Sequence, residues 1–287
     1  MSSEEFSWWK SFELITIWEF ASSVSPTSIG GSAVALFLLA QEKISTAKTV
    51  SIVVYSIVLD TLFFVVSMMI LYAMAGPIII RPGMISLGEI DGYGMTFFIV
   101  VIVMLLYGGL FTYGLFVRPD HLRSLLLAIS RIKFLSKFKE NISQTAEDVV
   151  VTSRELSQQP LLFHLKAISA TTMAWVLRFL ALNFIILALV GSTPLDFWNQ
   201  FIIYARGETM YAVTAFSPTP GGSGVAEYLF GGFFSDYIPQ GIATVVALVW
   251  RLITYYPYLF LGAIIIPVWI RELIIRRKKE AREAHKE

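Results

Sequence analysis

Charged side chains inside strongly apolar segments are the residues of this sequence most able to do chemistry. Placing one charge at the centre of a bilayer costs roughly 2.5–3.5 kcal/mol on insertion scales, so such charges need partners. A carboxylate and an arginine can satisfy each other, and arginine also fits the oxygens of a phosphate group. The sequence therefore predicts a site that binds or moves a charged lipid headgroup, with the candidate residues Asp60, Glu227, Arg251, Arg178 and Glu19.

Glu227 and Arg251 are the main candidates for an ion pair. Glu227 follows a glycine-rich stretch, and Arg251 lies on the next predicted helix. We expect these two residues to pair or to share a network, with Asp60 entering from the first half of the chain. Arg178, on the neighbouring predicted span, is a further candidate contact for an anion. A fixed ion pair that only holds the structure together is the alternative interpretation.

Two further charges, Arg206 and Glu208, lie in an apolar segment before this stretch. Residues that are two positions apart on a helix face different ways. We therefore expect one of the two to lie at the outer membrane interface.

The stretch before Glu227 cannot continue a helix, although it lies inside an apolar region. Proline lacks an amide donor and fixes φ, whereas glycine permits backbone conformations closed to other residues. In hydrocarbon a broken backbone survives only where protein or a watery cavity shelters its polar groups. A connecting loop outside the bilayer is the alternative. The predicted break residues are Pro218, Pro220, Gly221, Gly222 and Gly224.

An earlier stretch repeats this pattern. Residues 25–35, which contain Pro26, Gly30 and Gly31, match residues 217–226 with one extra residue before the glycine pair. Aromatic residues precede both prolines at the same distance, and each copy leads into a long apolar segment with one charge. Interrupted apolar segments in corresponding places of two repeats indicate a transporter-like site.

Composition indicates that the whole chain is an integral membrane protein. The 287 residues are 56 % hydrophobic and only 15 % charged, against roughly 25 % charged residues in soluble domains. No cysteine is present, which excludes disulfides and thiolate metal sites. The three histidines are isolated and the glycine-rich run lacks a Walker lysine, so we expect no metal, no cofactor and no catalytic residues. The acidic N-terminus does not resemble a cleavable signal peptide.

The predicted fold is an all-α, polytopic membrane protein with two repeats, each a re-entrant helical hairpin followed by a transmembrane helix. The hairpins, at about 8–40 and 199–236, have limbs too short or too polar to cross a bilayer, which requires roughly 20 apolar residues. The chain is expected to form one membrane domain, 1–287, with a first repeat at 6–117 and a second at 167–275. The predicted spans are Val50–Ala75, Met95–Val117, Ala167–Val190 and Gly241–Ile270, the last kinked at Pro257 and Pro267.

Basic residues predict how the chain is oriented. The amphipathic linker 118–166 and the tail 276–287 are rich in lysine and arginine, so the positive-inside rule predicts that both are cytoplasmic. Such a linker lies on the membrane surface or caps the bundle. Counting crossings from these segments, the two hairpins enter the cell membrane from opposite leaflets. The repeats are then inverted, and their tips approach each other near the midplane.

The run 218–227, followed by Arg251, resembles the family of lysylphosphatidylglycerol synthase transmembrane (flippase-like) domains. The stretch 26–31 and Asp60 resemble the first-half motif of that family, so the resemblance covers nearly the whole chain. It implies movement of a charged or polyprenyl lipid across the cytoplasmic membrane, with Asp60, Glu227 and Arg251 taking part. Bifunctional members have a separate cytosolic domain that makes the aminoacylated lipid. Because this sequence contains no such domain, the resemblance implies translocation rather than synthesis. Family members usually have further helices before the first hairpin, where this sequence begins.

The sequence therefore predicts a lipid flippase for a charged phospholipid or a polyprenyl-phosphate lipid. One alternative is a non-transporting membrane subunit that presents lipid to a partner enzyme. Another is an intramembrane enzyme that modifies lipid. The expected partners are membrane lipids, anionic or phosphate-bearing, together with a lipid-synthesising enzyme, and nucleic acid is not expected.

Overall fold

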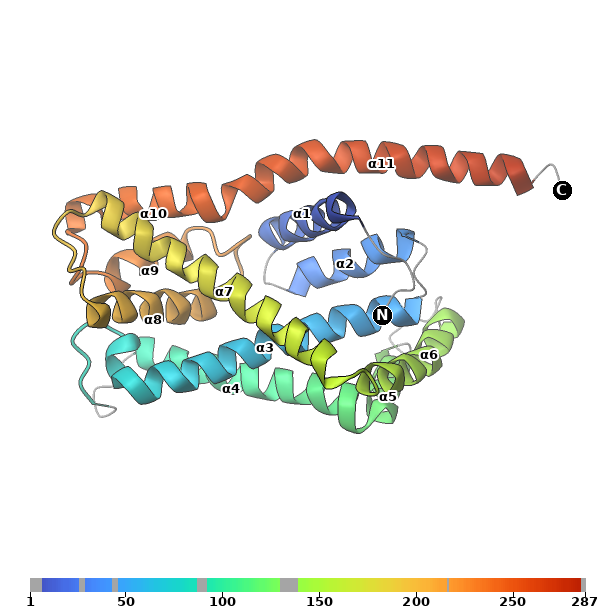
Figure 1. Cartoon of the computed structure of the whole chain (residues 1–287), viewed down its shortest axis with the longest axis horizontal. Helices are drawn as coiled ribbons and strands as arrows, with labels where there is room; N and C mark the ends of the chain where they lie inside the picture. Colours follow the sequence, from blue (N-terminus) through green and yellow to red (C-terminus); the bar gives the residue numbers. More distant parts are fainter. Residues whose placement is uncertain are drawn as a thin grey trace.

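The computed structural model describes residues 7–25, 29–42, 46–86, 92–129, 139–215 and 217–284. Within these ranges the chain forms helices and no β-strand, which confirms the predicted all-α class. Figure 1 shows an elongated bundle in which α7 crosses the other helices obliquely and α11 runs along one side.

Four helical segments of the described chain are long and apolar enough to cross a membrane: residues 48–79, 94–117, 161–189 and 240–279. They correspond to the four predicted spans. Their helices are α3 (Thr46–Ala75) with the short helix η1 (Gly76–Ile79), α4 (Gly92–Thr112) with the π-helical turn η3 (Tyr113–Val117), α7 (Leu161–Leu189), α10 (Gln240–Thr254) and α11 (Tyr256–Ala284).

The last predicted span consists of two helices rather than one kinked helix. α10 ends at Thr254, and Tyr255 departs from helical geometry with φ −123° and ψ −54°. Pro257 lies in the first turn of α11, where a missing amide donor has little cost. The prediction of a kink at Pro257 is therefore wrong in detail, because the interruption falls at Tyr255, before the proline. Pro267 lies inside α11.

Two pairs of shorter helices accompany the spans. The first helix pair is α1 (Trp8–Val24) and α2 (Ile29–Gln41), which pack against each other, and α1 also packs along α11. The second helix pair is α8 (Phe197–Thr214) and α9 (Val225–Phe233). None of these four helices is among the segments able to span a membrane. Their bounds correspond to the predicted hairpins at 8–40 and 199–236.

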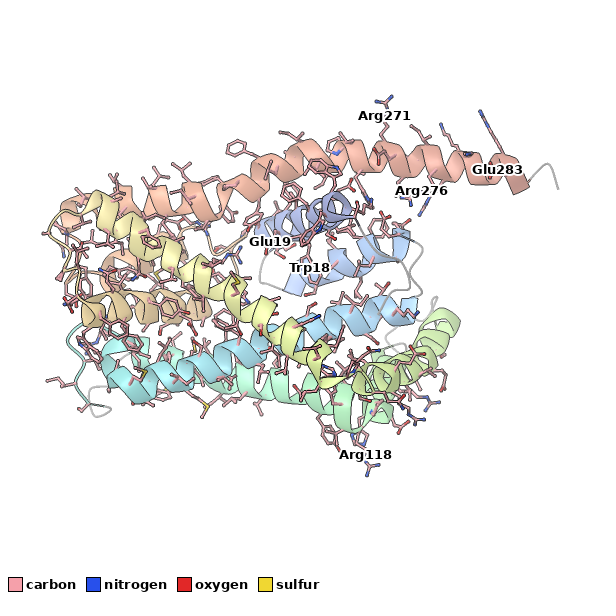
Figure 2. The ribbon with its side chains drawn as sticks, in the orientation of Figure 1. Trp18, Glu19, Arg118, Arg271, Arg276 and Glu283 are labelled. Carbon is pink, nitrogen blue, oxygen red and sulfur yellow. The ribbon has the colours of Figure 1, made fainter. Side chains whose placement is uncertain are left out.

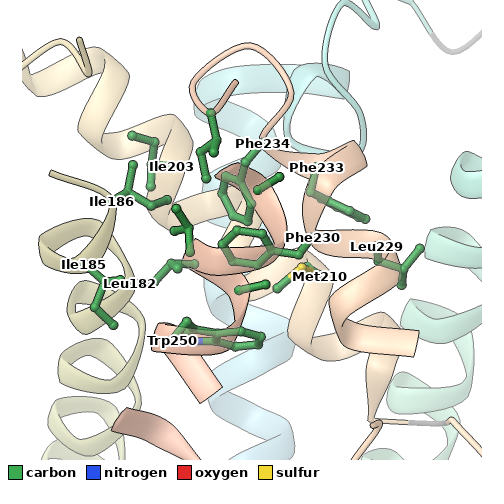
Figure 3. Close-up of a cluster of buried hydrophobic side chains, with 14 of the residues drawn as sticks. Leu182, Ile185, Ile186, Ile203, Met210, Leu229, Phe230, Phe233, Phe234 and Trp250 are labelled. Atoms are coloured by element: carbon green, nitrogen blue, oxygen red, sulfur yellow. The ribbon is translucent and has the colours of Figure 1, made fainter. Parts of the chain in front are cut away.

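Helix α8 lies in the interior of the bundle because α3, α4, α7 and α9 all pack against it. Figure 3 shows one of the apolar clusters around it, formed by Leu182, Met210, Phe230 and Trp250 with their neighbours. A second cluster joins α8 to α3 and α4. The helix is so enclosed that Arg206 and Glu208 are both 0 % exposed. Both side chains therefore lie inside the bundle and not on its surface.

Arg206 is held by polar groups from three segments. Its Nε donates to the Ile78 carbonyl oxygen at 3.0 Å and its Nη1 donates to the Phe233 carbonyl oxygen at 3.2 Å. The same Nη1 is 2.5 Å from Asp236 Oδ1, just after α9. These contacts fasten α8 to η1 and to the end of α9, so Arg206 stabilises the second helix pair.

The predicted linker forms α5 (Pro119–Ile129) and α6 (Lys139–Ser157), which pack against each other at one end of the bundle. Arg123 of α5 pairs with Glu147 of α6 at 2.5 Å. Figure 2 shows Arg118 near this end and Arg271 and Arg276 on the part of α11 that points the same way. The basic segments therefore gather at one end of the molecule, as one cytoplasmic face would require.

At this same end, a carboxylate fastens the first helix pair to α11. Glu42 lies 2.9 Å from Lys10 Nζ and 3.5 Å from Arg276 Nη1, and it accepts a hydrogen bond from Trp269 Nε1 at 3.2 Å. Burial by itself would raise the pKa of Glu42, but the hydrogen bonds from Lys10 and Trp269 outweigh it and hold the pKa below its ordinary value. We call these four residues the Glu42 cluster.

Candidate functional site

A cavity of about 130 Å³ lies where the first helix pair, α7, α8 and the α10–α11 junction meet. It is lined by the end of α1, by residues 217–222 and by the start of α11, so both halves of the chain contribute to it. The charged or hydroxyl-bearing side chains around it are Glu19, Ser22, Ser23, Arg178, Tyr211, Thr214, Ser217, Thr219, Arg251, Thr254, Tyr255 and Tyr258.

The predicted second break, residues 217–224, is an irregular turn between α8 and α9. Its glycines adopt positive φ, with values of 55° at Gly221, 68° at Gly222 and 83° at Gly224. A Cβ at Gly221 would lie 2.3 Å from a ring carbon of Tyr255. The glycines are therefore required both by the backbone conformation and by the close approach of the aromatic ring.

Glu227 stabilises this turn through the start of α9. Its Oε2 accepts a hydrogen bond from the Gly224 amide at 2.7 Å, which caps the helix. Its Oε1 lies 2.9 Å from Arg251 Nε. The predicted Glu227–Arg251 ion pair is therefore present.

Arg251 connects α10 to the turn. It is 6 % exposed, and its Nη2 donates to the Gly221 carbonyl oxygen at 2.9 Å and to Ser223 Oγ at 3.0 Å. Its guanidinium lies 3.8 Å from the ring centroid of Tyr255, within cation–π distance. Hydrogen bonds, the carboxylate and the ring together fix the guanidinium at the cavity wall.

Arg178 and Glu19 form a second ion pair on the cavity wall, with Nη2 and Oε2 3.3 Å apart. The Arg178 guanidinium lies 5.1 Å from the ring of Trp175 and 5.6 Å from the ring of Tyr258. Glu19 is near the end of α1 that points toward α7 (Figure 2). Sequence reasoning named both charges but did not pair them, because α1 and α7 are far apart in the chain.

Asp60 is close to this network but does not line the cavity. Its Oδ1 accepts a hydrogen bond from Trp175 Nε1 at 2.8 Å. The Arg178 guanidinium lies over the same indole ring, so Trp175 connects Asp60 to the cavity wall. Asp60 thus enters the network from the first half of the chain, as predicted, but through an aromatic neighbour.

The predicted first break differs from the expectation. Pro26 lies outside the described residues, whereas Gly30 and Gly31 lie in the first turn of α2 and do not interrupt it. A Cβ at Gly31 would be 1.8 Å from Ser22 Oγ. Gly31 therefore permits the close approach of α1 and α2, a packing role in place of the predicted backbone break.

Tyr255 is the residue that sequence reasoning missed. Its hydroxyl donates to the Ser23 carbonyl oxygen at 2.9 Å, at the end of the first helix pair, while its ring covers Arg251 and Gly221. One side chain thus joins the turns of both helix pairs. Tyr255 and Tyr256, just before Pro257, could have indicated this role from the sequence. A tyrosine suits a cavity wall because its ring packs against apolar groups while its hydroxyl makes a hydrogen bond.

Comparison with known proteins decides the family. Residues 2–262 match the family described as the lysylphosphatidylglycerol synthase TM region. The chain belongs to this family. It is also 27 % identical over 271 residues to a UPF0104 membrane protein of Archaeoglobus fulgidus, covering 90 % of this chain and 75 % of that protein. No solved structure matches the chain.

Membership in the lysylphosphatidylglycerol synthase TM family agrees with the resemblance seen in the sequence motifs. Among the described residues no group of histidine, aspartate and glutamate side chains could hold a metal ion. What the site offers is two arginines, each beside a glutamate and an aromatic ring. This arrangement can bind an anion or exchange ion pairs with a ligand that carries both charges.

Proposed function

We propose that the protein is a lipid flippase that carries a charged or phosphate-bearing headgroup through this cavity. The observation that carries the proposal is the two arginines, Arg178 and Arg251, which both line the cavity and are held there by carboxylates from the two halves of the chain. Guanidinium groups match phosphate oxygens with paired hydrogen bonds. A structural ion pair alone would not need a cavity beside it.

The size of the cavity favours a headgroup over a whole lipid. At about 130 Å³ it is smaller than the roughly 300–1,000 Å³ of pockets that enclose drug-sized ligands. Next to it, α10 and α11 expose apolar side chains such as Leu252, Phe260 and Ile264. In this proposal the headgroup enters the cavity and the acyl or prenyl chains stay in the bilayer against these helices.

Binding would proceed by exchange of ion pairs. Each arginine is already neutralised by a glutamate, so the empty site holds no unpaired charge at these positions. A phosphate that takes over Arg251 or Arg178 frees the glutamate, which can then accept an ammonium group or a proton. This exchange keeps the cost of buried charge small during movement.

In this proposal, movement of the two helix pairs against each other provides the alternating access. As re-entrant hairpins of inverted repeats they would enter from opposite leaflets, and the basic end with α5, α6 and the tail would be cytoplasmic. Rocking one pair against the other would open the cavity first to one leaflet and then to the other. The hydroxyl of Tyr255, on Ser23, lies at their junction.

Reconstituted vesicles test the proposal. Glu227→Gln and Arg251→Ala should abolish movement of a labelled anionic phospholipid between leaflets while expression stays normal, and Glu155→Gln, on the exposed face of α6, should move lipid at the wild-type rate. Full activity of both site variants would refute the site assignment. Retention of co-purified lipid without movement by the wild-type protein would favour a subunit that only presents lipid.

A further inference from the structure

Glu208 is a buried carboxyl that the lipid site does not use. It lies on α8, is 0 % exposed and faces α3. Its Oε2 accepts a hydrogen bond from Ser67 Oγ at 2.9 Å, and the Tyr204 hydroxyl, one turn earlier on α8, contacts the same carboxyl group. Its Oε1 is buried and has no hydrogen-bond partner among the described residues.

No cationic side chain of the described chain compensates Glu208. The arginines of α8 and of the adjacent α7 are engaged elsewhere: Arg206 with Asp236, and Arg178 with Glu19. The remaining titratable groups on the elements packed against α8 and on α8 itself do not contact its carboxyl; they are Lys48, Tyr55, Asp60, Tyr72, Arg81, Tyr107, His164, Lys166, Tyr211, Glu227, Tyr228 and Tyr237.

An ionised carboxylate in this position would lack both water and a counter-charge, which costs several kcal/mol. A neutral carboxylic acid avoids that cost. It keeps the Ser67 hydrogen bond on Oε2 and places its proton on Oε1, the atom that no donor of the described chain approaches. The hydroxyls of Ser67 and Tyr204 can donate hydrogen bonds to an ionised carboxylate, but neither group supplies the missing counter-charge, so the effect of burial outweighs them.

We propose that Glu208 is a proton-binding site, and that its proton couples the pH gradient across the membrane to lipid movement. In the conformation seen here, the packing of α8 against α3 shields the O–H group of Glu208 from water. When these helices separate, water reaches the carboxyl, the O–H bond breaks and the proton passes to water. The reverse step, on the other side of the membrane, takes a proton from water and restores the closed packing.

The position of Glu208 on α8 provides the coupling. Tyr211 and Ala215, three and seven residues further along, lie on the same face of the helix and line the cavity. On α3, Ser67 lies two turns from Asp60 on one face. A displacement of α8 against α3 therefore changes the proton site and the cavity together, which is the condition for reciprocal linkage between two ligands.

The proton site itself stands on burial and hydrogen bonding, whereas the coupling rests on the proposed flippase function. Two experiments separate them. The first uses infrared spectroscopy of the purified full chain at neutral pH. Wild type should show the C=O band of a protonated carboxyl that is absent in Glu208→Gln, shifted in Ser67→Ala and unchanged in Glu155→Gln. If no band depends on Glu208, the proton site is refuted, whatever the protein transports.

The second experiment uses vesicles of phosphatidylcholine and phosphatidylglycerol that contain NBD-labelled phosphatidylglycerol, with and without a pH gradient. For wild type, a gradient of one pH unit should shift the leaflet distribution of the probe by up to about tenfold for each coupled proton. Glu208→Gln, which keeps the shape of the neutral acid, should give the same distribution with and without the gradient. Probe movement by wild type that ignores the gradient would overturn the coupling and leave the flippase function standing. No probe movement by wild type under any gradient would count against the flippase function for this lipid, and the spectrum would still decide the proton site.

Discussion

The two helix pairs begin from similar sequence motifs but have different surroundings. The second pair is enclosed, with α8 surrounded by four elements and Arg206 fully buried. The first pair packs on α11 along one side and leaves Trp8 94 % and Trp9 72 % exposed. The comparison teaches that similar motifs do not fix the local structure, since the glycines form a turn in the second pair and permit close helix packing in the first. The surroundings decide how tightly each pair is held.

The interactions that hold each pair differ in the same way. The second pair is held by buried hydrogen bonds of Arg206 and Arg251 inside the bundle. The first pair is held at one end by the Glu42 cluster. Toward the cavity it is held by the partly exposed Glu19–Arg178 ion pair and by the hydrogen bond from the Tyr255 hydroxyl to the Ser23 carbonyl oxygen. We therefore expect the second pair to move as one unit, with α8 shifting against α3, and the first pair to move more freely against the rest of the bundle.

The largest effect should come from removing a partner of the buried Arg206. In Asp236→Ala the guanidinium stays inside the bundle without its carboxylate. Because the Asp236 side chain is itself 41 % exposed, the expected cost is that of a buried donor left unsatisfied, about 1–3 kcal/mol. Thermal unfolding in detergent measures the loss. Glu13→Ala, which removes a partner of Lys10 in the first pair, is the matched control and should cost less than about 1 kcal/mol. Equal losses in both variants would contradict the contrast between the pairs.

Gly221→Ala should have the next largest effect. An alanine at φ 55° costs roughly 1–2 kcal/mol, and its Cβ would displace the ring of Tyr255 from Arg251. We expect a lower melting temperature together with loss of lipid movement. Gly191→Ala is the control, because a Cβ there meets no atom within 4 Å. Wild-type stability and activity of Gly221→Ala would show that the turn is more plastic than described.

Tyr255→Phe should weaken the contact between the pairs and leave each pair intact. It removes one hydrogen bond, to the Ser23 carbonyl oxygen, worth about 1 kcal/mol, and keeps the ring on Arg251. Because the natural chain has no cysteine, spin labels can be placed at Phe37→Cys and Tyr228→Cys, which are both exposed. The distance distribution between them should broaden in Tyr255→Phe. A distribution that stays as narrow as in the unsubstituted chain would mean that other contacts hold the pairs together.

The smallest effect should come from acid at the Glu42 cluster. The folded-state pKa of Glu42 is below its ordinary value of 4.5, so its contribution to stability is present above that value and is lost as pH falls through the folded pKa. The contribution should be below about 1 kcal/mol, because the cluster borders solvent. After correction for the intrinsic pH dependence of amide exchange, the protection factors of α1 should fall below pH 4.5 in wild type. In Glu42→Gln they should already be lower at neutral pH and should not fall further on acidification. Wild-type protection factors that do not change with pH would show that the cluster does not stabilise α1.

Much of the fold follows from hydropathy. Four long apolar runs become four segments able to span a membrane, and the interrupted runs that precede the first and the last of them become the two helix pairs. Local chemistry also predicts the second turn, because three glycines at positive φ and a glutamate at the third position of α9 are a helix-start pattern that is visible in the sequence. The Glu227–Arg251 pair follows from the cost of burying either charge alone.

The same reasoning could not predict how the helices pack against one another. Enclosure of α8 depends on α3 and α4, which are distant in sequence, as well as on its neighbours α7 and α9, so the burial of Arg206 and Glu208 could not be predicted from their spacing. The pairing of Glu19 with Arg178 joins α1 to α7 across most of the chain. Gly31 shows a further limit, since a glycine can serve a turn or a close helix crossing, and only the position of Ser22 distinguishes the two.

Helix α11 has 29 residues and is therefore roughly 44 Å long, whereas the hydrocarbon of a bilayer is about 30 Å thick. This one helix, which contains Pro267, reaches from Tyr258 at the cavity wall to Arg276 in the Glu42 cluster and onward past the bundle (Figure 1). The Tyr258 ring in turn lies beside the Arg178 guanidinium. A protein that bound the protruding basic end would therefore hold the same helix that forms part of the cavity wall, without entering the membrane.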